Sequence, residues 1–148
     1  MTSDRVSATE TATEILEALA EQELAGVTEL AQIVDGSKAN VYKHLKTLED
    51  ADFVRKHKGK YKLGHRFLEF ATAAKLSDRI YRVGRYPVTQ LGNNTRTTAA
   101  LVTPESYKGV FIHVTSQQNN RDIEPVEGQH APLHELTTGL TILSQYNE

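Results

Sequence analysis

The chain has 148 residues, of which 39% are hydrophobic and 24% are charged, and it contains no cysteine or tryptophan. This length fits one domain or two small ones and leaves no room for a large catalytic scaffold. The absence of cysteine excludes a disulfide framework and any thiolate-bound zinc or iron–sulfur centre. We expect a soluble, cytoplasmic chain without a signal peptide, because no apolar run approaches the ~18 residues of a membrane span.

The net charge of −2 is unevenly distributed along the chain. Residues 1–36 carry a net charge of −7, residues 37–66 carry +6 and residues 67–148 carry −1. A basic block of this size attracts polyanions such as nucleic acid. On charge alone, a solvated basic face explains the pattern equally well.

An amphipathic helix is predicted over residues 8–21, because apolar residues recur there at the helical spacing. Its buried stripe is expected to comprise Ala12, Ile15, Leu16, Leu19 and Ala20. We predict that Gly26 ends this segment and that a short second helix follows, with Thr28 as its N-cap. The second helix is expected to bury Leu30, Ala31 and Val34.

A third helix is predicted to start after Ser37, its N-cap, and to run to about residue 50. Asp35-Gly36 precedes it and predicts a tight turn in which the glycine takes a positive φ. The core stripe of the third helix is expected to comprise Val41, Leu45 and Leu48. The hydrophobic period then changes to 2, so residues 53–57 and 60–63 predict an antiparallel hairpin. This order of elements is typical of a winged helix–turn–helix domain.

The second half of the chain begins with a long helical stretch from about residue 65. We expect it to break near Ser77-Asp78 or Gly84, with Pro87 opening a new helix that runs to about residue 91.

Strands are predicted over residues 97–102 and 110–114, joined by Pro104-Glu105-Ser106. A polar loop over residues 116–121 follows. A last helix is expected to start near Glu135 and to continue to the end of the sequence.

One face of the third helix is predicted to carry short polar and basic side chains. A recognition helix needs this arrangement, because its N-terminal half enters the major groove. We predict that Asn40 pairs with an adenine edge, that lysine reaches guanine acceptors, and that Lys46 meets phosphate. The face comprises Ala39, Asn40, Lys43, Lys46 and Thr47, with Lys38 and Tyr42 beside it.

Further phosphate contacts are predicted outside this helix. The backbone amides at the start of the second helix, next to Thr28, offer one anion site through the helix dipole. The hairpin offers another through Lys56, Lys58 and Lys60, and His57 there is expected to make DNA affinity pH-dependent. An ordinary helical core with exposed lysines is the alternative. The cap and turn residues of the helix–turn–helix, the polar face and the lysine hairpin together favour DNA binding.

Residues 27–70 resemble the N-terminal domain of the IclR family of prokaryotic transcription regulators. The similarity rests on the recognition helix KANVYKHLKTLEDADFV and on the wing GKYKLG, followed by a linker helix. More loosely, TTAALVTPESYKGVFIHVTS resembles the first two strands of the family's effector-binding domain, and GQHAPLHELTTG resembles its PLH…G segment. The resemblance implies an α+β chain with a winged helix–turn–helix domain over residues 1–66. It also implies a linker helix and dimerisation region over residues 67–91, and a partial α/β effector-binding-like region over residues 92–148.

The resemblance further implies a homodimer that regulates transcription by binding a palindromic operator in double-stranded DNA. It implies no enzymatic activity and no cofactor, and it makes a small organic acid the effector class, with Thr138 and Gly139 as candidate contacts. The sequence departs from the family at Ser37, where proline is usual, and at Asp52, where glycine is usual. The chain ends where the family's ligand-binding sheet is about half built. We therefore expect either that effector sensing has been lost or that the sequence is a fragment.

Two other functions stay open. The first is a winged-helix module whose basic surface binds an acidic protein partner, and the second is a small-molecule sensor that retains carboxylate binding. No G-x-S-x-G elbow or other catalytic constellation is present.

Several remaining side chains have a structural explanation. His130 and His134 lie four residues apart, but Pro132 separates them and the segment lacks an H-E-x-x-H pattern, so we expect no metal site. His44 is predicted to be a partly buried packing residue. We expect Tyr81 and Tyr86 to pack the linker helix or a dimer interface.

Overall fold

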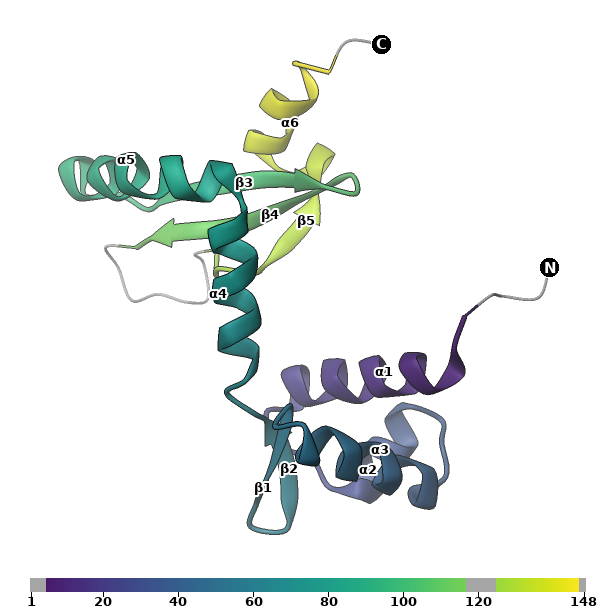
Figure 1. Ribbon diagram of the computed structural model, residues 1–148. Helices are drawn as coiled ribbons and strands as arrows, with labels where there is room; N and C mark the ends of the chain where they lie inside the picture. The colour runs from purple at the N-terminus through teal and green to yellow at the C-terminus, as the bar shows by residue number, and fades with distance from the viewer. Residues whose placement is uncertain (1–4, 117–124, 147–148) are drawn as a thin grey trace. The chain divides into compact units, whose positions relative to one another are not determined.

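The computed structural model describes residues 5–116 and 125–146, and the chain divides into two compact units, residues 1–71 and 72–148 (Figure 1). No helix within the described ranges is long and apolar enough to cross a membrane. The first unit contains α1 (Ser7–Gln22), α2 (Val27–Ile33), α3 (Lys38–Asp50), β1 (Val54–His57), β2 (Lys60–Leu63) and the start of α4 (Phe67–Ser77). The second contains the rest of α4, α5 (Arg79–Thr95), β3 (Ala99–Glu105), β4 (Lys108–Thr115), β5 (His130–Pro132), the 3-10 helix η1 (Leu133–Glu135) and α6 (Thr137–Leu143).

Helices α1 to α3 and the β1–β2 hairpin enclose one apolar core in the first unit. Burial of each large side chain in such a core stabilises the fold by about 1.5–3 kcal/mol. The predicted inward faces of α2 and α3 are confirmed, because Leu48 and Val34 also pack against this core. The side chains at its centre are at most 2% exposed: Ile15, Leu19, Leu30, Val41, Leu45, Val54 and Tyr61.

The buried stripe of α1 differs from the prediction at Ala20, which is exposed, whereas Ala18 is buried. At about 100° per residue, Ala20 lies about 140° around the helix from Ile15 and so points away from the core. The predicted bounds of this helix, residues 8–21, are confirmed to within one residue at each end, and Glu23 takes a φ of 59° just after it.

The N-terminus of α2 lies two residues earlier than predicted, so Thr28 is not its N-cap. Gly26 occupies that position, and its N–H donates to the Glu29 carboxylate at 2.7 Å. Thr28 lies inside the first turn and is exposed. The prediction failed because a glutamate three residues beyond the N-cap reaches back to the free backbone amide, as in half of a capping box.

The turn between α2 and α3 forms at the predicted place but with a different residue in the left-handed region. Asp35 takes a φ of 47°, while Gly36 is not in that region. Aspartate adopts this conformation more readily than most side chains, so the glycine is not needed for it. Ser37 caps α3 as predicted, since its hydroxyl accepts the Asn40 N–H at 3.2 Å.

The hairpin has the predicted register, with His57 opposite Lys60 and a two-residue turn. Lys58 and Gly59 both have positive φ, 49° and 81°, as a type I′ turn requires. One pairing was not predicted. Ala25 forms a β-bridge with Tyr61, in which each N–H donates to the other's carbonyl at 3.0 and 2.8 Å. The segment before α2 is therefore tied directly to the wing.

The hairpin closes against the end of α3 through a tight backbone contact. Asp52, at the position where the family resemblance places glycine, takes a φ of 60°. Gly64 lies against it so closely that a Cβ there would be 2.2 Å from the Asp52 carbonyl oxygen. Only glycine fits at residue 64 without moving this backbone.

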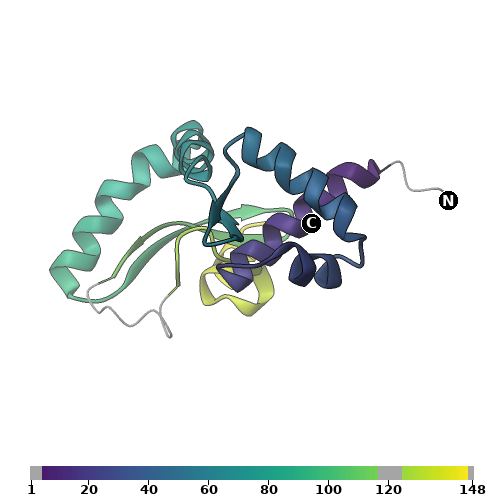
Figure 2. The ribbon, with the colours of Figure 1, turned by 90° about the horizontal axis from the view of Figure 1, so that it is seen from below.

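The helical stretch breaks at Asp78, which is one of the two sites that the sequence predicted. The Asp78 carboxylate accepts the Ile80 N–H at 2.6 Å and so caps α5. The predicted break at Gly84 and the new helix at Pro87 are wrong, because α5 runs through both. At Gly84 a Cβ would lie 2.9 Å from Leu101 Cδ2, so the glycine allows α5 to pack against the strands. Figures 1 and 2 show α5 alongside β3 and β4.

The sheet of the second unit has the antiparallel order β3-β4-β5. The predicted link at residues 104–106 is displaced, because Pro104 and Glu105 continue β3 and the turn is made by Ser106 and Tyr107, both with positive φ. The predicted last helix is shorter than expected: η1 comes first, and α6 ends at Leu143. Most of the predicted polar loop falls on residues 117–124, outside the described residues.

We predict that Leu45→Ala lowers the free energy of unfolding by about 2–5 kcal/mol, because it leaves a cavity in the core of the first unit. Leu45 is 0% exposed. Ile33→Ala, at a position 52% exposed at the end of α2 in the same unit, serves as the control and should change stability by less than about 0.5 kcal/mol. Urea unfolding followed by circular dichroism measures both. Equal stability of the two variants would contradict the core assignment.

Candidate nucleic-acid interface

The structure presents the predicted reading face of α3 to solvent. Val41 and Leu45 are 0% exposed on the opposite side of the helix. Within residues 5–116 and 125–146, no carboxylate pairs with Lys38 or Lys43, so both ammonium groups are available to an anion. All residues predicted for this face are exposed: Lys38, Ala39, Asn40, Tyr42, Lys43, Lys46 and Thr47.

The side chains at the C-terminal end of this face, Lys46 and Thr47, already have polar partners within the protein. Lys46 Nζ lies 2.7 Å from Asp50 Oδ1 and 3.8 Å from Glu49 Oε2. The hydrogen bond to Asp50 and the attraction of both carboxylates raise the pKa of Lys46 above its usual value. The Thr47 hydroxyl donates to the Lys43 carbonyl at 3.0 Å. A phosphate at Lys46 would therefore have to compete with Asp50.

The start of α2 is occupied by an acidic side chain. Glu29 accepts from Gly26 N–H, and Lys60 Nζ from the wing lies 2.9 Å from Glu29 Oε1. The Gly26 hydrogen bond, followed by the Lys60 hydrogen bond, holds the pKa of the Glu29 carboxyl below its usual value. Since an ionised carboxylate already binds this helix end, it repels a phosphate from the amide site predicted beside Thr28.

The wing carries the predicted lysines and two cations that the prediction left out. Lys56 and Lys58 are exposed, and Lys56 Nζ lies 5.3 Å from the centre of the Tyr61 ring. Arg55 and Lys62 are directly paired across the strands, which places them on one face of the hairpin. The period-2 alternation of the hairpin sequence could have identified Arg55 and Lys62 as part of the basic surface. The basic surface of the wing therefore extends from its tip towards its base.

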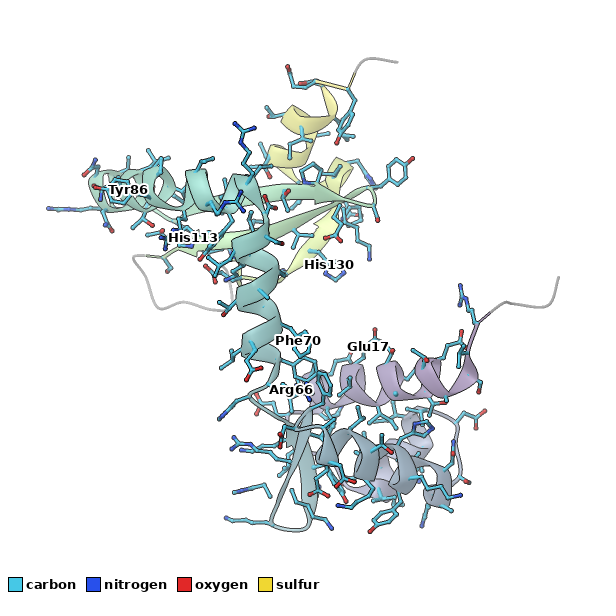
Figure 3. The ribbon with its side chains drawn as sticks, in the orientation of Figure 1. Glu17, Arg66, Phe70, Tyr86, His113 and His130 are labelled. Carbon is cyan, nitrogen blue, oxygen red and sulfur yellow. The ribbon has the colours of Figure 1, made fainter. Side chains whose placement is uncertain are left out.

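The base of the wing holds the first residues of α4 by aromatic and cationic contacts. The Phe53 ring packs against Phe67 and Phe70, with centroid separations of 5.2 and 5.4 Å. The Arg66 guanidinium lies over Phe53 and Phe70, at 4.9 and 5.6 Å from their centres, and donates to the Ala51 carbonyl (Figure 3). These contacts hold the start of α4 against the rest of the first unit.

The candidate residues outside this surface lie at separate places. His44 is half-buried at the edge of α3, as predicted. No group of three or more His, Cys, Asp or Glu that could hold a metal occurs in the described part of the chain, and His134 Nε2 lies 3.7 Å from Glu135 Oε1.

The two candidate effector contacts lie on α6 and differ in exposure. Thr138 is exposed, and Gly139 is buried. A Cβ on Gly139 would lie 2.0 Å from the Leu133 carbonyl oxygen. Gly139 therefore allows α6 to pack against η1, and the effector role of both residues stays a prediction.

Comparisons with known proteins agree with this geometry. A model of a helix–turn–helix domain matches residues 8–57. The chain is 28% identical over 144 residues to the probable HTH-type transcriptional regulator ArcR of Halobacterium salinarum, covering 95% of this chain and 55% of that protein. It is 30% identical over 132 residues to the HTH-type transcriptional regulator KdgR of Dickeya chrysanthemi, covering 88% and 43%.

The fold is also similar to a solved structure, the IclR transcriptional regulator from Alicyclobacillus acidocaldarius. The TM-score is 0.76 at 23% identity, and the match covers 97% of this chain and 60% of that one. The chain spans about half the length of the two curated relatives above.

The geometry at Glu29 predicts the response of its pKa to substitution. Lys60→Gln should raise the pKa of the Glu29 carboxyl part of the way to its usual value, because the ammonium is lost while the larger influence, the Gly26 N–H, remains. Lys62→Gln removes the same charge from the same strand and should leave this pKa nearly unchanged. A carbon-13 NMR pH titration of the side-chain carboxyl measures both, and equal shifts would show that general wing charge rather than the ion pair is responsible.

Proposed function

Because the chain belongs to the IclR family of helix–turn–helix proteins, over its N-terminal domain and part of its C-terminal region, we propose that it binds double-stranded DNA as a sequence-specific transcription regulator. The family is one of regulators and not of enzymes. The observation that carries the proposal is the exposed polar and basic face of α3, opposite the fully buried Val41 and Leu45.

Sequence reading is assigned to the N-terminal half of α3. Ala39 and Asn40 project from its first turn, where a recognition helix meets base edges, and Lys43 follows one turn later. Ala39 leaves space for close approach and contacts a thymine methyl, while Asn40 pairs with adenine and Lys43 with guanine. Each well-formed base contact contributes about 1–3 kcal/mol of discrimination.

Phosphate binding is assigned mainly to the wing. Lys56 and Lys58 are exposed near the hairpin tip, and Arg55 and Lys62 extend this charge towards its base. Such contacts supply affinity for DNA of any sequence and orient the reading helix. Lys46 and Lys60 contribute only when phosphate displaces their carboxylate partners, which lowers their share of non-specific binding.

We further propose that the chain acts in the cytoplasm as a homodimer on a palindromic operator. Two α3 helices related by two-fold symmetry would read half-sites about one helical turn, ~34 Å, apart. Large apolar side chains on α4 support an association surface there, since Leu68, Phe70 and Leu76 are 66%, 51% and 52% exposed. Selection of bound duplexes from a random pool tests this directly, because an inverted repeat reports both specificity and dimer geometry.

Substitutions in α3 and in the wing should have different signatures. Asn40→Ala and Lys43→Ala each remove a base contact, so each should weaken operator binding by about 1–3 kcal/mol and random-sequence binding by less. Lys58→Ala should weaken both to the same degree and lower the salt slope by ~1, because it removes one phosphate contact. Fluorescence anisotropy at several salt concentrations measures these values.

Two outcomes would overturn the assignment. Unchanged operator affinity in both α3 variants would mean that another surface reads the bases. If no duplex is bound near physiological salt, the basic surface serves an acidic protein partner instead.

The ion pair between Glu29 and Lys60 predicts a variant with increased DNA affinity. Glu29→Gln keeps an oxygen for the Gly26 N–H but releases Lys60, so affinity for random-sequence DNA should increase and the salt slope should rise by ~1. Glu17→Gln removes the same charge from an exposed position on α1 and should have a smaller effect on both. Equal effects of the two variants would show that only net charge matters.

A further inference from the structure

A small hollow lies between α5 and β4 in the second unit. Its volume is about 230 Å³. This is less than the ~300 Å³ at the lower end of drug-sized ligand sites, so it suits a small molecule. Figure 3 labels Tyr86 on α5 and His113 on β4. The hollow is lined by Tyr81, Arg85, Tyr86, Thr89 and His113.

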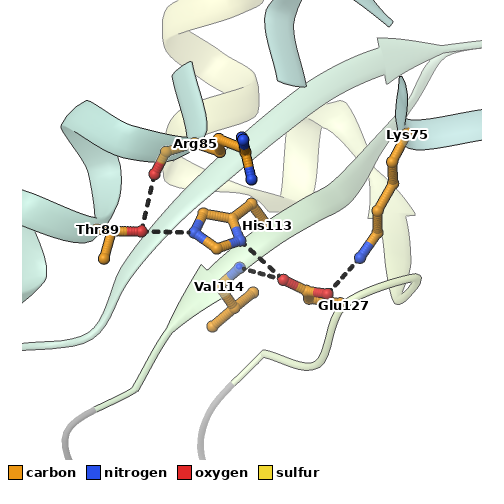
Figure 4. A network of polar contacts seen from close by, with 6 residues as sticks. All are labelled: Lys75, Arg85, Thr89, His113, Val114 and Glu127. Atoms are coloured by element: carbon orange, nitrogen blue, oxygen red, sulfur yellow. Dashed lines mark hydrogen bonds and ion pairs between the residues drawn. The ribbon is translucent and has the colours of Figure 1, made fainter. Parts of the chain in front are cut away.

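The position of His113 is fixed by hydrogen bonds at both ring nitrogens (Figure 4). Nδ1 lies 2.9 Å from Glu127 Oε1, and Nε2 lies 2.9 Å from Thr89 Oγ1. The Thr89 hydroxyl is 2.8 Å from the Arg85 carbonyl, which can only accept, so its proton is used there. A carboxylate oxygen can only accept, so Nδ1 carries a proton and donates it to Glu127.

Glu127, the acid of this network, is fully engaged by other donors. It accepts from His113, from the Val114 N–H at 3.1 Å and from the Lys75 ammonium. Burial raises the pKa of the Glu127 carboxyl, but these hydrogen bonds outweigh it and leave that pKa below its usual value. The carboxylate therefore stays ionised and is committed to holding His113 and Lys75.

Three basic side chains converge on the Tyr81 ring. The His113 ring meets it edge to face at a centroid separation of 6.1 Å, Lys75 Nζ lies 5.6 Å from its centre, and Arg85 Cζ lies 6.0 Å from it. Within the ranges that the structure describes, no carboxylate forms an ion pair with Arg85. Among these described residues one acid thus faces three bases, and none of the described carboxylates pairs with the guanidinium beside the hollow.

We propose that this hollow binds a small oxyanion, the carboxylate or phosphate group of a compact molecule, with Arg85 as its principal ligand. The guanidinium supplies a fork of donors that matches such a group. The rings of Tyr81 and Tyr86 form the walls, and His113 lines the hollow from β4. Thr138 and Gly139, the candidate effector contacts, do not line this hollow, and the assignment does not depend on DNA binding.

Isothermal titration of the 148-residue chain without DNA tests the proposal, with sodium acetate, sodium benzoate and inorganic phosphate as probes at low ionic strength. At least one probe should bind at a single site. Arg85→Gln should weaken that binding by roughly tenfold or more, because a charged hydrogen-bond partner is lost. The fold is retained in this variant, since Thr89 uses the backbone carbonyl of residue 85 and not its side chain; circular dichroism checks this.

Arg79→Gln is the matched control, because Arg79 is an exposed arginine on the same helix that does not line the hollow. It should change the affinity by less than about twofold, the residual effect of a screened distant charge. Equal weakening by both substitutions would mean diffuse charge attraction and would overturn the site, as would the absence of binding with all three probes.

The probes also separate the two sources of the anion. Tyr86→Ala removes a wall that is 70% exposed. If benzoate binding weakens in this variant and phosphate binding does not, the site takes organic carboxylates. If only phosphate binds, and Tyr86→Ala leaves its affinity unchanged, the site takes phosphate groups.

Discussion

The burial of Val41 and Leu45 determines which side of α3 faces solvent, and the proposed DNA interface depends on it. A helix turns by about 100° per residue, so two fixed positions fix the direction of every other side chain. Rotating α3 would expose these apolar groups and bury Asn40 and Lys43, and both changes cost free energy. Ser37 determines where the helix begins, because its hydroxyl accepts the Asn40 N–H. The reading face is therefore a consequence of packing on the other side of the helix.

Several features that depend on near neighbours were predicted correctly from the sequence, although the cap of α2 was not, and features that depend on specific distant contacts were missed. The Ser37 cap and the hairpin turn are decided within a few residues, and both predictions were confirmed. The break predicted at Gly84 was wrong because the glycine contacts Leu101, a partner that only the folded unit brings near. The bridge between Ala25 and Tyr61 likewise joins segments with no shared local pattern.

The same distinction applies to the candidate sites. Periodicity was sufficient to find the exposed residues of α3, because a helix face follows from spacing alone. It was not sufficient to show that Glu29 binds Lys60, which lies 31 residues away. The hollow beside His113 needs a helix, a strand and a segment near residue 127 to meet, and no sequence motif marks that meeting.

Both units use an ionised glutamate in the same physical way. Glu29 accepts a backbone N–H and binds Lys60, while Glu127 accepts the Val114 N–H and binds Lys75 and His113. In each case the hydrogen bonds lower the pKa of the carboxyl, so the negative charge persists and the basic partner is held in one place. A carboxylate committed in this way cannot neutralise the next cation along. Basic residues for which the described part of the chain shows no carboxylate partner, such as Lys58 on the wing and Arg85 beside the hollow, keep their positive charge available to an external anion.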